Sequence, residues 1–275
     1  MLVLHRISEL RAALAGASSV ALVPTMGNLH EGHLSLVRRA QDAKGTVVAS
    51  IFVNPLQFAP SDDFESYPRT LERDCSMLRE VGCDVVFAPT EREMYPAPQT
   101  YMVQPAPALA NVLEGAIRPG FFNGVCTVVL KLFNIVRPDR AYFGKKDYQQ
   151  LLVVEQMVRE FALPIEVVPV DTVRDSSGLA MSSRNSYLSA DERHHAAGLY
   201  ATLCRVAAEV AGGRNDWQDL ERQACTDLAG RGGWVLDYVT IRRRSDLGLP
   251  EGAAPLVALA AARLGTTRLI DNIEI

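Results

Sequence analysis

The sequence has 275 residues, of which 48% are hydrophobic and 22% charged, and its formal net charge is -4. This length allows a sizeable core, in one large domain or two modest ones. The negative charge argues against a general nucleic-acid binder, which normally carries a basic surface.

The cysteines and the N-terminal residues bear on where the protein works. The five cysteines are scattered and form no Cys-x-x-Cys pair, so the sequence predicts neither a zinc site nor a disulfide framework. The N-terminal residues lack the features of a signal peptide, and no apolar run reaches the length of a membrane span. We therefore expect a cytoplasmic protein that binds neither a membrane nor nucleic acid.

After a short predicted helix over Ser8–Ala15, the stretch from residue 20 to residue 37 reads as a strand, a glycine turn and a helix. Its apolar run breaks at Pro24, passes Gly27 and resumes at helical spacing. His30 and His33 lie three residues apart at the helix entrance, on one face. A helix N-terminus with imidazole donors suits a polyphosphate. The spacing fits neither a helical zinc pair nor a Walker loop.

The run Thr46–Val53 is rich in β-branched residues and predicts a parallel strand buried on both faces. It ends just before Asn54 and Gln57. In open α/β sheets the carboxyl ends of the strands are where ligands bind. Two uncharged amides at that edge suit a small hydroxylated or carboxylated substrate.

Strands alternate with helices over the rest of the first part of the chain, which predicts a Rossmann-like, doubly wound parallel sheet. We expect helices at residues 70–80, 126–136 and 149–161, strands at 85–87, 141–143 and 165–170, and a short strand within the proline-rich segment 95–107.

The character of the sequence changes in its last third. We expect helices at residues 191–211 and 216–229, then strands at 235–241, 256–262 and 268–272. The fold class is therefore α/β, with a Rossmann-like domain over residues 1–173 and a smaller C-terminal α+β domain over residues 174–275.

Two more polar loops complete the candidate site. Gly144 to Asp147 offers backbone N–H groups, two lysines and a carboxylate, a set that suits a nucleotide. Met181 to Asn185 contains Arg184, a cation that can clamp a phosphate. Taken alone each loop is ordinary, but His33, Lys146 and Arg184 all follow predicted strands and can converge on one phosphate chain.

The ordered set of motifs resembles the pantothenate synthetases, the pantoate and β-alanine ligases of the nucleotidyltransferase superfamily. The resemblance covers nearly the whole chain, and His30-Glu31-Gly32-His33 is similar to the His-x-Gly-His signature of that superfamily. The motifs are Pro-Thr-Met-Gly-Asn-Leu-His-Glu-Gly-His at 24–33, Phe-Val-Asn-Pro-Leu-Gln-Phe at 52–58, Tyr-Pro-Arg-Thr at 67–70, Leu-Glu-Gly at 113–115, Lys-Leu-Phe-Asn-Ile-Val-Arg-Pro-Asp at 131–139, Lys-Asp-Tyr-Gln-Gln-Leu at 146–151, Met-Ser-Ser-Arg-Asn at 181–185 and Leu-Gly-Thr-Thr-Arg-Leu-Ile-Asp-Asn at 264–272.

The resemblance implies an ATP-dependent ligase that makes pantothenate in two steps. Pantoate would attack the α-phosphorus of ATP to give pantoyl adenylate and pyrophosphate, and β-alanine would then displace AMP. The family also implies Mg²⁺ and a homodimer.

The resemblance also implies a role for each domain and for individual residues. The domain over residues 1–173 would bind the nucleotide and pantoate, and the domain over residues 174–275 would act as a lid. His33, His30, Lys146 and Arg184 would be catalytic, with His33 as the proton donor, and Gln57, Gln150 and Asn54 would bind substrate. The nucleotide would be held by Met26, Gly27, Asn28, Leu29, His30, Glu31, Gly32, His33, Gly144, Lys145, Lys146, Asp147, Val173, Met181, Ser182, Ser183 and Arg184.

Three positions depart from the family pattern. Family members often have glutamate in place of Lys145, an acidic pair in place of Arg73-Asp74, and histidine in place of Phe121. Asp74 remains as the expected metal partner. Lys145 and Arg73 would add positive charge near the phosphates and slow the release of pyrophosphate.

Other functions remain to be weighed against this one. A nucleotidyltransferase of the same superfamily would act on a phosphorylated small molecule and would need more arginines than the amides Gln57 and Gln150. A nucleotide-sensing module without catalysis would have lost residues such as His33 and Lys146. A tRNA synthetase is disfavoured by the acidic charge.

Overall fold

The computed structural model describes residues 1–58, 64–65 and 67–275, which form two compact units. Unit 1 comprises Met1–Gly144 and Gln149–Val170, and unit 2 comprises Lys145–Tyr148 and Asp171–Ile275. The expected boundary after residue 173 stays a prediction. Unit 2 takes in the four-residue segment Lys145–Tyr148 near the middle of the chain, which is preceded and followed by residues of unit 1.

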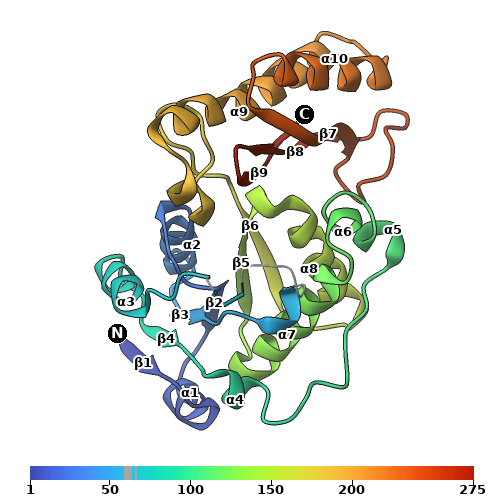
Figure 1. Cartoon of the computed structure of the whole chain (residues 1–275). Helices are drawn as coiled ribbons and strands as arrows, with labels where there is room; N and C mark the ends of the chain where they lie inside the picture. Colours follow the sequence, from blue (N-terminus) through green and yellow to red (C-terminus); the bar gives the residue numbers. More distant parts are fainter. Residues whose placement is uncertain (59–63, 66) are drawn as a thin grey trace. The chain divides into compact units, whose positions relative to one another are not determined.

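Unit 1 is built on a six-stranded sheet in the order β1-β4-β3-β2-β5-β6 (Figure 1). Every pairing is parallel, so the prediction of a parallel α/β sheet is confirmed. The strands are β1 (Leu2–Leu4), β2 (Val20–Thr25), β3 (Thr46–Ile51), β4 (Val85–Phe87), β5 (Arg140–Gly144) and β6 (Glu166–Val170).

The expected break at Pro24 is wrong, because β2 continues to Thr25 with Pro24 paired to Ser50 of β3. A proline is tolerated in a strand where its missing N–H costs no ladder hydrogen bond. The pairing of β2 with β5 covers only Ala21 and Leu22, so the proline lies beyond the part of β2 that has neighbours on both sides.

Helices cover both faces of this sheet. Helix α2 packs with α3 over a cluster that includes Ala21, Val23, Val47 and Ala49. The alternating positions Leu22 and Val48, also fully buried, face the opposite side. There α7 contacts β2, and α1 contacts α7. The helical segments are α1 (Ile7–Leu14), α2 (Glu31–Gln41), η1 (Pro55–Gln57), α3 (Leu71–Glu80), α4 (Glu91–Met94), α5 (Pro107–Ala110), α6 (Glu114–Ile117), α7 (Phe121–Val136) and α8 (Tyr148–Glu160).

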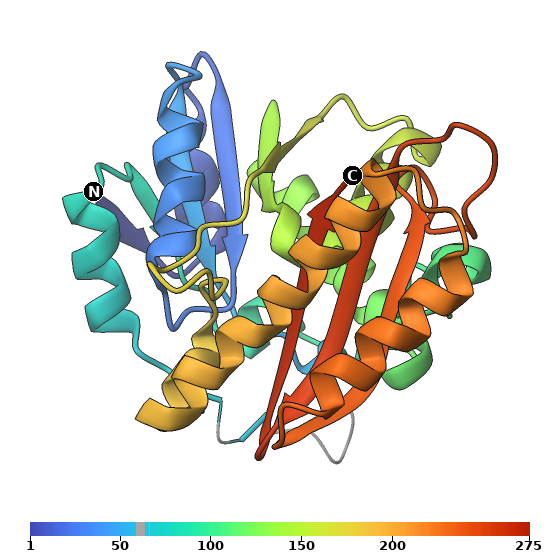
Figure 2. The ribbon, with the colours of Figure 1, turned by 90° about the horizontal axis from the view of Figure 1, so that it is seen from above.

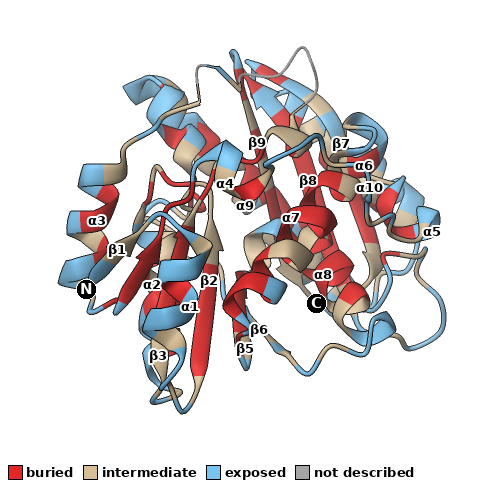
Figure 3. Cartoon of the chain, turned by 90° about the horizontal axis from the view of Figure 1, so that it is seen from below, coloured by how far each residue is buried: buried red, intermediate tan, exposed pale blue. Residues whose placement is uncertain are grey.

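Burial follows the sequence pattern of each strand. The inner strands β2 and β3 are red over most of their length in Figure 3, as expected for strands with both faces covered. All five cysteines are free thiols. Burial raises the pKa of Cys83 to about 11 and that of Cys126 to about 12, so both stay protonated and act as apolar core residues.

Other differences from the sequence predictions are local. None of the residues 95–107, all of which the structure describes, belongs to a strand. Helix α7 begins at Phe121 rather than at Cys126. The helices α4, α5 and α6 were not predicted, because four residues make about one turn and show no helical period, and the strand β1 was not predicted either.

Unit 2 contains a three-stranded antiparallel sheet in the order β7-β8-β9, with α9 and α10 packed on it (Figure 2). Its core includes Leu199 and Leu203 of α9, Leu228 of α10 and Ile241 of β7. The elements are η2 (Lys145–Asp147), η3 (Ser183–Tyr187), α9 (Ala190–Ala211), α10 (Trp217–Ala229), β7 (Trp234–Arg243), β8 (Leu256–Leu264) and β9 (Thr267–Glu274). Within the described residues, no helix is both long enough and apolar enough to cross a membrane.

Gly124 generates a testable prediction about how α7 meets η1. A Cβ at this position would lie 2.1 Å from the carbonyl oxygen of Leu56, which is backbone and cannot swing aside. We expect Gly124→Ala to lower the free energy of unfolding by about 1–3 kcal/mol through overpacking, as measured by urea denaturation. The matched control is Gly16→Ala, where a Cβ meets nothing within 4 Å. Equal stability of the two variants would contradict the close approach.

Candidate active site

The turn between β2 and α2 adopts a conformation that its residue types allow. Gly27 has a φ of 82° and Asn28 a φ of 50°, the left-handed region that glycine and asparagine tolerate best. A Cβ on Gly27 would lie 3.1 Å from Oδ2 of Asp74 and 3.1 Å from Cγ2 of Ile51. The glycine therefore lets the turn approach a carboxylate closely.

That carboxylate holds the turn in place. Asp74 is fully buried at the start of α3. Its Oδ2 accepts hydrogen bonds from the N–H of Asn28 at 2.9 Å and from the hydroxyl of Thr70 at 3.0 Å, and its Oδ1 accepts from the N–H of Leu29 at 2.9 Å. Two backbone donors that no helix or strand pairs are thus satisfied by one side chain.

These bonds bear on the expected metal role of Asp74, which stays a prediction. Both of its oxygens are already acceptors for protein donors, and the neighbouring Arg73 is exposed. Over residues 1–58, 64–65 and 67–275, no three His, Cys, Asp or Glu side chains are grouped so that they could hold a metal ion. The surroundings of Asp74 favour a structural role.

His30 and His33 lie together at the N-terminus of α2, as the sequence predicts. Their ring centroids are 4.1 Å apart and the rings are inclined by 32°. His30 is the N-cap residue, and its Nδ1 accepts a hydrogen bond from the N–H of Gly32 at 3.1 Å. Because Nδ1 is an acceptor, the proton of the neutral ring is on Nε2, which can donate to an anion. The helix terminus adds partial positive charge.

Asn54, the N-cap residue of η1, forms a hydrogen-bonded pair with Gln57, and the two residues have different contacts. Asn54 is fully buried and donates from Nδ2 to Oε1 of Gln57 at 3.0 Å and to the carbonyl of Gly124 at 3.2 Å. Its Oδ1 accepts from the hydroxyl of Tyr95 at 2.8 Å. Asn54 therefore orients Gln57, whose Nε2 is the end of the amide that can donate to a ligand oxygen.

The neighbouring glutamines Gln149 and Gln150 of α8 differ in burial. Gln149 is buried and holds the segment before α7, donating to the carbonyls of Leu109 at 2.7 Å and Val112 at 2.8 Å and accepting from the N–H of Glu114 at 3.0 Å. Sequence reasoning gave Gln149 no role. Gln150, the predicted substrate residue, is only partly buried.

The lysines of η2 belong to unit 2. Nζ of Lys145 lies 2.8 Å from Asp171 and 3.0 Å from Glu274. The hydrogen bond to Asp171 raises the pKa of Lys145, against the effect of burial. Its ammonium is thus balanced by two carboxylates, which differs from the expected extra positive charge. Lys146 has a longer contact of 3.7 Å to Asp147.

A small hairpin and the segment after it contain the other residues of unit 2 that the sequence predicts to bind the nucleotide. The N–H of Met181 donates to the carbonyl of Val173 at 2.9 Å, which brings these two predicted neighbours of the nucleotide together. Ser182 then caps η3, accepting from the N–H of Arg184 at 3.3 Å. Arg184 is exposed, while Asn185 is buried and donates to the carbonyl of Ala180 at 3.0 Å.

Comparisons with known proteins agree on one family. A family model described as pantoate-beta-alanine ligase matches residues 2–274. A pantothenate synthetase of Leptothrix cholodnii is 59% identical over 287 residues and covers 100% of both chains. One of Nitrosospira multiformis is 57% identical, over 99% of this chain and 98% of the relative.

Solved structures give the same result. The crystal structure of pantothenate synthetase from Thermus thermophilus has a TM-score of 0.94 at 47% identity and covers 100% of this chain and 99% of the other. That of pantoate-beta-alanine ligase from Francisella tularensis, complexed with beta-gamma ATP and beta-alanine, has a TM-score of 0.82 at 32% identity, with 100% and 97% covered.

The role of Asp74 can be tested by substitution. Asp74→Ala leaves the N–H groups of Asn28 and Leu29 without their acceptor, so we expect the free energy of unfolding to fall by about 2–4 kcal/mol. Urea denaturation would be measured with and without Mg²⁺. The matched control is Arg73→Ala, the exposed neighbour on the same helix, which we expect to be nearly neutral. A destabilisation that appears only when Mg²⁺ is present would instead mark Asp74 as a metal ligand.

Proposed function

The chain belongs to the pantoate-beta-alanine ligase family, and on that premise we propose how its residues carry out the ligation of pantoate to β-alanine. The reaction of this family is ATP-dependent. A carboxylate oxygen of pantoate attacks the α-phosphorus of ATP and pyrophosphate leaves. The amine of β-alanine then attacks the acyl carbon of pantoyl adenylate, a proton is lost from nitrogen, and AMP leaves with the pair of electrons of the broken C–O bond.

The first step depends on charge stabilisation rather than on covalent catalysis by the protein. Negative charge builds on the oxygens around phosphorus and on the leaving pyrophosphate, so donors fixed in advance lower the barrier. The turn before α2 supplies such donors, and this observation carries the proposal. His30 contributes Nε2–H because its Nδ1 accepts from Gly32. His33, whose ring lies beside that of His30, has the proton-donor role toward the phosphates.

The pantoate-binding role rests on the amide pair of η1. Asn54 fixes the orientation of Gln57, so Gln57 presents donors that fit a carboxylate or hydroxyl oxygen without adding charge. We assign Asn54 as the positioning residue and Gln57 as the substrate contact. Gln150 is the second proposed pantoate contact.

The remaining assignments concern the nucleotide. We propose that Val173 and Met181, paired across their hairpin, flank the adenine, and that Lys146 and Arg184 neutralise phosphate charge. Residues 26–33 and 144–147 hold the nucleotide. The N–H groups of Asn28 and Leu29 bind Asp74 and that of Gly32 binds His30, so these three groups shape the turn rather than contact ATP. Lys145 contributes its backbone, since its ammonium is bound by Asp171 and Glu274.

Three further proposals complete this function. Mg²⁺ would enter with ATP and would neutralise negative charge on the phosphates, because Mg²⁺ is commonly held by substrate phosphates rather than by a protein cage. We also propose that the enzyme works as a homodimer in the cytoplasm, from its family and its free cysteines.

The function can be tested by following each half of the reaction. We expect exchange of labelled pyrophosphate into ATP only when D-pantoate is present, and release of AMP when β-alanine is then added. Exchange that does not depend on pantoate would contradict the proposed function.

His33→Ala serves as the site variant in the same assay. We expect its exchange rate to fall by about a hundredfold or more, since it removes a group acting mainly in the transition state. His195→Ala, an exposed histidine of α9, is the matched control and should exchange like the parent protein.

A further inference from the structure

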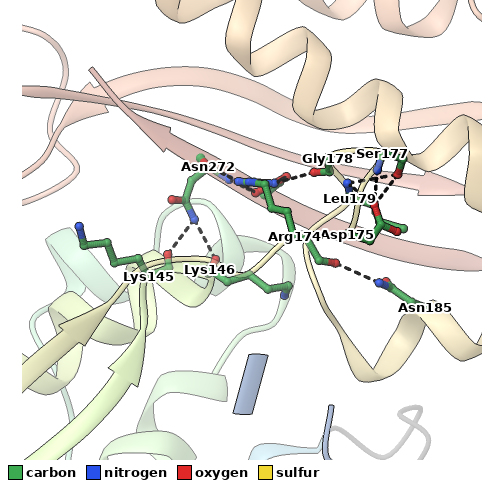
Figure 4. Close-up of polar contacts among 11 residues, drawn as sticks. Lys145, Lys146, Arg174, Asp175, Ser177, Gly178, Leu179, Asn185 and Asn272 are labelled. Atoms are coloured by element: carbon green, nitrogen blue, oxygen red, sulfur yellow. Dashed lines mark hydrogen bonds and ion pairs between the residues drawn. The ribbon is translucent and has the colours of Figure 1, made fainter. Parts of the chain in front are cut away.

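The C-terminal strand β9 provides one side chain that binds the backbone of η2. Nδ2 of Asn272 donates to the carbonyl of Lys145 at 2.8 Å and to the carbonyl of Lys146 at 2.9 Å (Figure 4). The residue is 6% exposed. A single amide group thus uses both of its hydrogens on two successive carbonyls of a segment that lies about 127 residues away in sequence.

The preceding residue binds the hairpin. Asp271 makes two parallel hydrogen bonds with the guanidinium of Arg174, at 2.6 Å to Nη1 and 2.8 Å to Nη2. The side chain of Asp271 is 4% exposed and that of Arg174 16%. A bidentate pair in this setting is strong and directional.

Arg174 is fixed by more than this pair. Its Nη2 donates to the carbonyl of Asn272 at 3.2 Å, its Nη1 donates to the carbonyl of Gly178 at 3.1 Å, and its Cζ lies 3.4 Å from the ring centroid of Tyr200. Figure 4 shows Arg174 between Asn272 and the turn at Gly178. The hairpin that carries Val173 and Met181 is therefore held to the same point of β9 as η2.

We propose that the Asp271–Asn272 pair is a positioning element for the adenylation step: it sets η2, with Lys146, and the hairpin, with Val173 and Met181, in one fixed relation. This inference rests on the proposed function. Neither residue of the pair has to touch ATP, because each acts through the segment it binds. A positioning element matters most where charge develops, since a small misplacement of a fixed donor raises the barrier steeply.

The geometry explains why these residue types are present. Asn272 can donate twice from one atom, whereas aspartate would place a negative charge against two carbonyl oxygens. Asp271 matches the fork of the Arg174 guanidinium, and its Oδ1 also accepts from the N–H of Asn272 at 2.8 Å. Asp271 and Asn272 are thus bonded to each other as well as to η2 and the hairpin.

The test measures the two half-reactions of Asn272→Ala separately. We expect pantoate-dependent pyrophosphate exchange to fall about tenfold or more, while the reaction of preformed pantoyl adenylate with β-alanine changes by less than about threefold. An equal loss in both half-reactions, or unchanged exchange, would overturn the proposal.

A double-mutant cycle with Lys146→Ala separates positioning from general destabilisation. If Asn272 acts through Lys146, the double variant should exchange no more slowly than Lys146→Ala alone. Losses that multiply would mean an independent, structural effect and would overturn the proposal.

The matched control is Asp237→Asn, which weakens another partly buried ion pair of unit 2, with Arg268 at 2.7 Å. We expect this variant to keep the parent exchange rate even if its melting temperature falls. If it loses exchange as Asn272→Ala does, the effect on adenylation is not specific to the pair. Failure of the parent protein to show any pantoate-dependent exchange would count against the proposed function itself.

Discussion

The polar backbone groups of the loops are the constraint on which the candidate site depends. A parallel sheet pairs the backbone of its strands, but the segments that follow the strands leave N–H and carbonyl groups that need partners when they are buried. This chain meets the need with single buried polar side chains. Asp74 binds the turn before α2, Asn54 binds the carbonyl of Gly124 in α7, and Asn272 binds η2. In each case the two partners lie far apart in the sequence, so the loops are held by tertiary contacts.

This arrangement suits a reaction in which the protein stabilises charge. Donors that are already in place need not reorganise when the pentavalent phosphorus forms, and that saving is the usual source of electrostatic catalysis. The same anchors explain the small residues nearby. Gly27 allows the turn to approach Asp74, and Gly124 allows α7 to approach the backbone of η1. Lys145 fits this view, because Asp171 and Glu274 bind its ammonium and leave its backbone to shape η2.

Much of the fold was predictable from the sequence, because the helices and strands follow from the local spacing of apolar and β-branched residues. The β-branched run of β3 and the helical spacing of α8 predict both elements within a few residues, and the motif around His30 and His33 marks the turn before α2 as a candidate phosphate site. The anchors were not predictable in the same way. Asp74 binds residues 45 and 46 positions away, and Asn272 binds residues about 126 positions away. No periodicity connects such partners. The sequence therefore shows Asp74 only as a carboxylate that suits a metal ion, and it shows Asp271 and Asn272 only as part of a family motif.

We infer that these side chains fix the loops before any ligand binds. Amide hydrogen exchange of the ligand-free protein measures how firmly they do so. We expect the N–H groups of Asn28 and Leu29, although they lie in a turn, to exchange as slowly as those of the buried strand β3, because Asp74 accepts both of them. Exchange at these two amides as fast as in an unstructured peptide would mean that Asp74 does not hold the turn in the ligand-free protein.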